Sequence, residues 1–194
     1  MPALAIDHWP LPYEERLASR PSSAIDLVVI HCTELPDMTM AREFGERVHY
    51  AGTQTGNSGH YYIDLEGRVF QFVDDTRVAN HVCGYNPRSI GIELVNIGRY
   101  PHWGDSRFQA FTVPYTAAQI DSLRALLGQL HSKHANLRWI AGHEDLDRRL
   151  EPATDDPATM LPRRQDPGPL FPWADVLKGA GLERLMPTAP ADSR

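Results

Sequence analysis

Residues 25–32, IDLVVIHC, are the stretch on which the fold prediction rests. Branched and apolar side chains fill them almost without interruption, which is typical of a strand buried on both faces. Residues 89–96, SIGIELVN, alternate like a second strand. One face of it would carry Ile90, Ile92 and Leu94, and the other Gly91, Glu93 and Val95. A third strand is expected over residues 137–141, LRWIA.

Helical spacing appears between these strands. Residues 38–51 place Met40, Phe44 and Val48 four apart. Thr116 begins the clearest helix, because Gln119 three positions later completes a capping box. This helix carries one apolar stripe, formed by Ile120, Leu123, Leu127 and Leu130.

The remaining segments predict a hairpin, a last helix and loops. Residues 60–73 are typical of a hairpin with Glu66-Gly67 at the turn. Residues 173–185 are expected to form a short helix, and 151–169, with five prolines, a long loop. Two further loops are expected over residues 52–59 and 98–115.

Strands alternating with helices predict an α/β fold: a single domain with a central mixed β-sheet flanked by helices. The expected hairpin makes part of the sheet antiparallel. We expect an irregular N-terminal arm over residues 1–24, the domain itself over 25–186, and a disordered tail over 187–194.

Composition narrows the function classes. The chain has 194 residues, of which 42% are hydrophobic and 23% charged, as in an ordinary soluble domain. A net charge of −6 argues against nucleic acid or an anionic membrane as partner. We find no bilayer-spanning apolar run and no signal peptide, so we expect a protein that works in the cytoplasm or reaches its substrate by a route without a signal peptide. Cys32 and Cys83 are expected to be buried thiols.

Two histidines and one aspartate form a candidate metal site. His31 and His143 each end a predicted strand, and neighbouring strand ends can meet at one edge of a sheet. Two histidines and a carboxylate are a common catalytic zinc set that leaves one position open. Asp166 is the best carboxylate, because Pro167 favours an extended backbone before it. The alternatives are core histidines and an aspartate that starts a turn.

One other zinc motif is excluded. His143-Glu144 is followed by Asp145, Leu146 and Asp147, so the second histidine of an H-E-x-x-H helix is missing.

Five motifs in order resemble the type 2 zinc N-acetylmuramoyl-L-alanine amidases. They are VVIHCTE, SGHYYIDLEGRVFQFV, SIGIELVN, AGHEDL and DPGPLFPW, spread over residues 25–173. That family includes a cytoplasmic anhydro-muropeptide amidase, cell-wall amidases, phage endolysins and peptidoglycan recognition proteins. The resemblance implies a zinc cleft at the sheet edge and hydrolysis of the amide bond between N-acetylmuramic acid and L-alanine in peptidoglycan or muropeptides.

The resemblance also implies roles for single residues. His31, His143 and Asp166 match the ligands of one zinc ion, and Glu93 matches a general base. Arg164 lies where the cytoplasmic amidase has a catalytic lysine; an arginine can stabilise an oxyanion but cannot shuttle a proton. Where the phage enzymes have a catalytic tyrosine this chain has Gly59, so a tyrosine-based mechanism is not expected there.

Substrate contacts are predicted around the second strand. Stem peptides carry carboxylates, so Arg88 is the leading candidate, with a solvated loop arginine as the alternative. Asn86 and His81 are further candidates, and His60 is either a substrate contact or a core histidine. We expect surface positions for His102, His131 and His134.

Other functions remain open at this point. The chain could be a peptidoglycan-binding module without activity, although such relatives typically lack part of the metal triad, or a protein with incidental histidines. As an enzyme it could recycle muropeptides, act as an endolysin, or be an exported antibacterial effector with a cognate immunity protein. The long 151–169 loop favours the two roles that degrade the wall.

Overall fold

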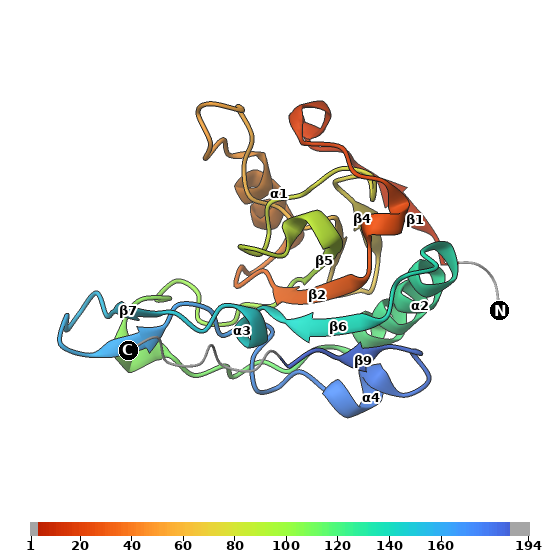
Figure 1. Ribbon diagram of the computed structural model, residues 1–194. Helices are drawn as coiled ribbons and strands as arrows, with labels where there is room; N and C mark the ends of the chain where they lie inside the picture. The colour runs from red at the N-terminus through yellow and green to blue at the C-terminus, as the bar shows by residue number, and fades with distance from the viewer. Residues whose placement is uncertain (1–3, 187–194) are drawn as a thin grey trace, which may run out of the picture.

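The computed structural model describes residues 4–186, so the predicted disordered tail, 187–194, lies outside the described residues. Seven strands form one central sheet (Figure 1). Their order across the sheet is β1 (Ile6–His8), β4 (Val69–Gln71), β3 (Tyr61–Ile63), β5 (Ser89–Leu94), β2 (Leu27–Cys32), β6 (Trp139–Gly142) and β9 (Glu183–Arg184).

The sheet is mixed, as predicted. Only β3 and β4 pair antiparallel, because they form the expected hairpin. The other neighbouring pairs are parallel. Strand β2 lies between β5 and β6, and its six residues are all buried. Its pairing with β5 puts His31 opposite Glu93, which fixes where the site is built.

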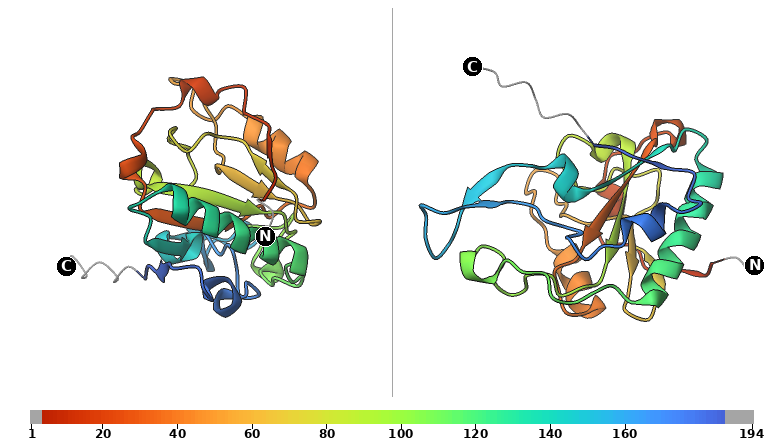
Figure 2. Two further views of the ribbon diagram at one scale, coloured as in Figure 1. Left: turned by 90° about the vertical axis from the view of Figure 1, so that its right-hand side faces the viewer. Right: turned by 90° about the horizontal axis from the view of Figure 1, so that it is seen from below.

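Helix α2 (Ala117–Lys133) covers one face of the sheet (Figure 2). The predicted capping box is present: the Thr116 side chain accepts from the Gln119 backbone, and the Gln119 side chain accepts from the Thr116 backbone. Four leucines of α2 join the main core cluster with Ile90, Ile92 and Leu94 of β5; they are Leu123, Leu126, Leu127 and Leu130. Ile120, predicted in the stripe, is partly buried beside them.

Two neighbouring positions on α2 should respond in opposite ways to alanine. Leu127 is fully buried, so Leu127→Ala is expected to lower the free energy of unfolding by about 2–5 kcal/mol. A Cβ added at Gly128 meets nothing within 4 Å, so Gly128→Ala should raise it by roughly 0.5–1 kcal/mol. Urea denaturation of both variants measures the pair; equal effects would contradict this packing of α2.

Two predicted helices are shorter in the structure. Helix α1 (Met38–Glu46) ends before Val48, because the backbone at Arg47 is already extended. Val48 is exposed. The predicted 173–185 helix is only α4 (Trp173–Leu177). Gly179 and Gly181 both have positive φ, which a right-handed helix does not allow. The chain then adds β9 to the sheet.

The N-terminal residues are less irregular than predicted. Strand β1 pairs with β4 along the edge of the sheet, and two single-turn 3₁₀ helices follow it (Glu14–Arg16 and Ser22–Ala24). Apolar side chains between these elements are buried against Phe72 and α1, namely Leu11, Tyr13 and Leu17. The segment therefore closes a second part of the core rather than trailing as an arm.

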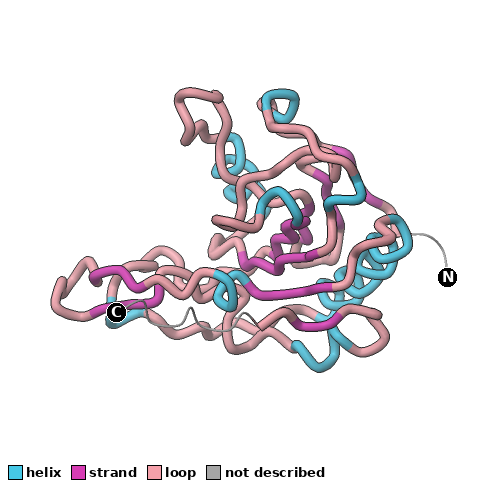
Figure 3. Tube along the Cα trace, in the orientation of Figure 1, coloured by secondary structure: helices cyan, strands magenta, loops and turns pink. Residues whose placement is uncertain are grey.

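The predicted 151–169 loop contains a hairpin. Strands β7 (Leu150–Pro152) and β8 (Met160–Pro162) form a separate two-stranded sheet, drawn as short strands within loop in Figure 3. This hairpin was not predicted, because a proline ends each strand and most of its residues are exposed, so no apolar pattern marks it. It projects beyond the main sheet on the same side as residues 98–115 (Figure 2), and the Thr154 N–H donates to the Gly104 carbonyl at 2.7 Å.

Short 3₁₀ helices complete the architecture, at Asn86–Arg88 before β5 and at Ser106–Phe108 in the 98–115 segment. Among residues 4–186, no helix combines the length and apolarity that crossing a bilayer requires.

Candidate metal centre

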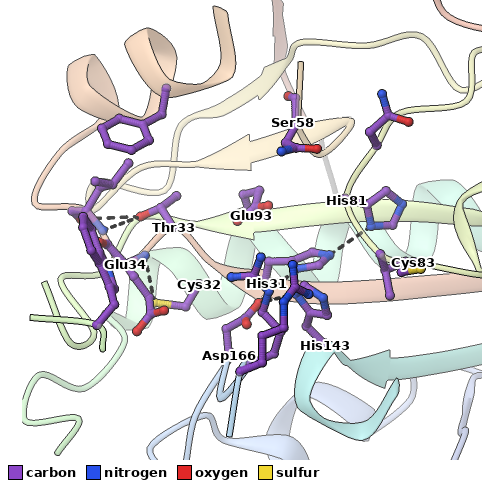
Figure 4. A pocket seen from close by; sticks show the side chains of 18 of the residues that line it. His31, Cys32, Thr33, Glu34, Ser58, His81, Cys83, Glu93, His143 and Asp166 are labelled. Carbon is purple, nitrogen blue, oxygen red and sulfur yellow. Dashed lines mark hydrogen bonds and ion pairs between the residues drawn. The ribbon is translucent and has the colours of Figure 1, made fainter. Parts of the chain in front are cut away.

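Three side chains far apart in the sequence converge as predicted (Figure 4). The Asp166 Oδ2 atom lies 2.9 Å from His31 Nδ1 and 3.2 Å from His143 Nδ1, and the two Nδ1 atoms are 3.1 Å apart. All three residues are buried. Two imidazoles and one carboxylate in this arrangement could hold a metal ion.

The fold explains why they meet. His31 lies near the end of β2, and His143 begins α3 (His143–Leu146) directly after β6, the parallel neighbour of β2. Asp166 is brought to the same edge because its carbonyl accepts from the Glu144 N–H at 3.0 Å. Gly142 permits this approach, since a Cβ there would lie 2.8 Å from Pro167 Cδ.

The electrostatics of His31 and Asp166 suit a cation. Burial lowers the pKa of His31 to about 4, against the opposing effect of its hydrogen bond to Asp166, so His31 is neutral at pH 7 and can be a ligand. Burial opposes ionisation of Asp166, but His143 and His31 outweigh it and hold the pKa of this carboxyl well below its usual range. The triad therefore offers a neutral imidazole and a carboxylate.

His81 lines the cleft, but its ring is engaged. His81 Nδ1 lies 2.9 Å from His31 Nε2, and His81 Nε2 lies 3.1 Å from Ser89 Oγ. Burial, together with the neighbouring His31, keeps the pKa of His81 well below its usual value. Gly91 makes room for the ring, because a Cβ there would lie 2.7 Å from it. In this position His81 orients the His31 imidazole.

Glu93 lies on β5, directly opposite His31 of the neighbouring strand β2, and close to the triad (Figure 4). Burial, and then the charge of Asp166, raise the pKa of Glu93 to about 8. Gly59 packs so closely that an added Cβ would lie 2.9 Å from Glu93 Cγ. A bulkier residue at position 59 would displace the carboxyl group.

A cleft of about 900 Å³ opens over this centre. Its floor includes the triad and Glu93, and one wall comes from the β7–β8 hairpin, with Glu151, Pro152, Leu161 and Pro162. Arg164 also lines the cleft. Its Nε atom is buried and has no hydrogen-bond partner among the described residues. A guanidinium group that lines a cleft and has an unpaired N–H is suited to a negatively charged group of a ligand.

The other predicted contacts are placed differently. Asn86 lines the cleft, but its side-chain oxygen accepts from the backbone N–H groups of His81 and Val82. Arg88 does not line the cleft, since it pairs with Asp26 at 2.5 and 2.6 Å. His60 is fully buried and bonded to Arg20, Arg77 and Gly91, which fits the core-histidine alternative.

Several residues near the site were not predicted or lie elsewhere than predicted. Cys83 is exposed in the cleft, whereas Cys32 is buried as predicted. His134, expected at the surface, is buried and contacts Asp75 at 2.9 Å. Glu34 and Arg99 form a buried ion pair beside the site, and only Glu34's place three residues after His31 could have drawn attention to it.

Comparison with known proteins explains this arrangement. The family model described as N-acetylmuramoyl-L-alanine amidase matches residues 21–169, which hold all three triad residues and Glu93. The chain belongs to this amidase family. The match confirms the resemblance drawn from the five sequence motifs, and the amidase fold agrees with the α/β sheet described above.

Individual relatives give the same assignment. The amidase AmiD of Escherichia coli K12 is 30% identical over an alignment of 138 residues, which covers 61% of this chain and 43% of AmiD. The chain thus spans less than half the length of AmiD. The endolysin of Escherichia phage T7 is 28% identical over 130 residues, 66% of this chain and 82% of the endolysin.

Solved structures of this amidase family share the fold. The amidase LysC of Clostridium intestinale has a TM-score of 0.67 at 21% identity, covering 92% of this chain and 99% of LysC. A complex of E. coli AmiD with the substrate anhydro-N-acetylmuramic acid-L-Ala-D-γ-Glu-L-Lys has a TM-score of 0.60 at 25% identity, covering 85% of this chain and 60% of AmiD.

Proposed function

We propose that this chain is a zinc-dependent N-acetylmuramoyl-L-alanine amidase, which hydrolyses the amide bond between N-acetylmuramic acid and L-alanine. One observation carries the proposal: His31, His143 and Asp166 converge at the floor of a cleft that Glu93 also lines. A module that only binds peptidoglycan needs no such set of ligands and base.

The donor set fits zinc. Donor atoms of a tetrahedral zinc site lie about 2.0–2.1 Å from the ion, and therefore roughly 3.3 Å from one another. The three donor atoms here are 2.9, 3.1 and 3.2 Å apart. Three protein ligands leave the fourth position open, as in catalytic zinc sites. Bound there, zinc supplies Lewis-acid chemistry that acidifies a water molecule and polarises the amide carbonyl.

Glu93 is assigned the proton transfers. Its carboxylate accepts a proton from the attacking water and delivers it to the leaving amine of L-alanine. The raised pKa of Glu93, to about 8, suits both steps because it lies near the working pH. A cation on the triad opposes part of this rise, since a nearby positive charge favours the ionised carboxyl group.

Arg164 is assigned to the negative charge of the substrate or of the oxyanion formed during attack. Arg164→Met should lower kcat/KM at least ~10-fold, because it removes the cationic donor that has no protein partner on Nε. Steady-state kinetics separate the two roles: a fall in kcat indicates oxyanion stabilisation, and a rise in KM indicates substrate binding. Unchanged kcat and KM would contradict both. Arg138→Met, at an exposed ion pair with Glu183, is the matched control.

The relatives support a proposal for the substrate class. AmiD is complexed with an anhydro-muropeptide, and the T7 relative is an endolysin. We propose that this chain takes muramoyl-peptides, with polymeric wall as its main substrate, because the β7–β8 hairpin adds a wall to the cleft that holds the metal centre. The delivery route to the wall and the immunity protein of an effector remain predictions from sequence.

Mass spectrometry of products tests the proposed function. The enzyme should release free L-Ala-initiated peptides from purified sacculi and, more slowly, from soluble anhydro-muropeptide. Faster release from the soluble substrate would indicate a recycling enzyme. Binding to sacculi without any released peptide, in protein shown to contain zinc, would contradict the amidase assignment and favour the binding module.

A further inference from the structure

The third ligand, Asp166, lies in a loop, so something must hold it in place. The segment 165–168 has no strand or helix of its own. Residues 98–115, here called the clamp, run beside it. We propose that the clamp positions Asp166 for metal binding, an inference that rests on the zinc site of the proposed function.

The clamp contacts this loop at three points. The Gln165 Nε2 group donates to Gln109 Oε1 at 2.7 Å, and the Tyr115 hydroxyl donates to the Pro167 carbonyl at 2.7 Å. Gly168 packs on Phe111, since a Cβ there would lie 2.7 Å from the ring. Gln109, Phe111 and Tyr115 thus contact the residues on either side of Asp166. The loop has little freedom to carry the carboxylate away from the histidines.

The clamp is itself anchored to the strand of the first ligand. Arg99 Nε and Nη2 donate to the two carboxylate oxygens of Glu34, each at 2.7 Å, and this ion pair is buried. Glu34 follows His31 by three residues and has a φ of 49°, which few residues other than glycine adopt. The bidentate pair holds it in that conformation. Gly98 must be small, because a Cβ there would lie 2.7 Å from Glu34 Cγ.

Gln109 joins the two ends of this arrangement. Its side-chain oxygen accepts from Arg99 Nη1 at 3.1 Å as well as from Gln165, and its Nε2 donates to the Trp103 and Asp105 carbonyls. A continuous set of hydrogen bonds therefore runs from Glu34, near His31, to Gln165, next to Asp166. Groups that orient metal ligands typically contribute 10–100-fold to metal affinity. The clamp residues are positioning residues and take no part in proton transfer.

The test measures zinc affinity of the full chain by competition with a chromophoric chelator. Gln109→Ala and Gln165→Met should each weaken Zn²⁺ binding ~10-fold, and Tyr115→Phe, which removes one hydroxyl, should weaken it less. The double variant at positions 109 and 165 should bind zinc about as weakly as either single variant, because both substitutions break the same hydrogen bond between Gln109 and Gln165. Gln129→Ala, a half-buried glutamine of α2 distant in sequence from the triad, is the matched control.

Unfolding of the metal-free variants in urea separates positioning from stability. If the clamp only positions Asp166, the metal-free variants should have urea midpoints near that of the metal-free wild type. The midpoints of variant and wild type should then differ only when zinc is present. Two results would overturn the clamp but leave the proposed function standing. One is wild-type zinc affinity in both glutamine variants. The other is a fall in the urea midpoint of the metal-free variants as large as the fall with zinc present. A wild-type chain that binds no zinc would instead overturn the proposed function, and the clamp with it.

Discussion

His143→Ala is expected to lose both its zinc and its activity. The variant removes one of three donors, and the remaining His31 and Asp166 leave the ion too weakly held at ordinary zinc concentrations. Loss of Lewis-acid stabilisation amounts to several kcal/mol in the transition state, so turnover should fall at least ~10³-fold. Metal analysis of the purified variant and release of peptide from sacculi measure the two effects.

His8→Ala is the control for this variant. His8 is exposed on β1, at the edge of the sheet, and should keep full zinc content and turnover. Circular dichroism should show that both variants are folded. A His143→Ala protein that retains zinc and hydrolyses peptidoglycan at the wild-type rate would remove His143 from the site.

Glu93→Gln should separate catalysis from metal binding. Glutamine has the shape of glutamate and fits beside Gly59, but it cannot accept a proton. We expect zinc content and substrate KM close to those of the wild type and a kcat lower by ~10²-fold or more. The measurement is kcat on a soluble muramoyl-peptide at saturating concentration.

The pH profile adds a second readout for Glu93. In the wild type the acidic limb of kcat/KM should report the pKa of the base, and this limb should be absent in the variant. Glu43→Gln, an exposed carboxylate on α1, is the matched control and should change neither kcat nor the profile. Unchanged turnover in Glu93→Gln would end the general-base assignment.

The centre of the fold could be predicted because its signals are long and periodic. Buried strand β2, the alternation of β5 and the capping box at Thr116 each involve several residues that favour one structure. His31 lies near the end of β2 and His143 directly follows β6, so their meeting follows from the parallel pairing of these two strands. Asp166 was predicted on weaker grounds, from the proline that follows it and from the family motif, because no periodic element carries it.

The periphery could not be predicted for physical reasons. Strands of two or three residues, such as β1 and β9, show no measurable alternation and form because a sheet edge is already present. The predicted 173–185 helix ends at Leu177, and Gly179 and Gly181 beyond it have positive φ values that a right-handed helix does not allow. The Glu34–Arg99 pair joins residues 65 apart, and such contacts leave no local pattern.

The most direct test of the assignment of His31, His143 and Asp166 is the zinc content of the purified wild-type chain. Zinc content and activity are measured before chelation, after chelation and after zinc is added back. We expect about one zinc ion per chain, loss of peptide release when a chelator removes it, and recovery when zinc is restored. A chain that cleaves peptidoglycan at an undiminished rate without zinc, and is indifferent to chelators, would contradict the account.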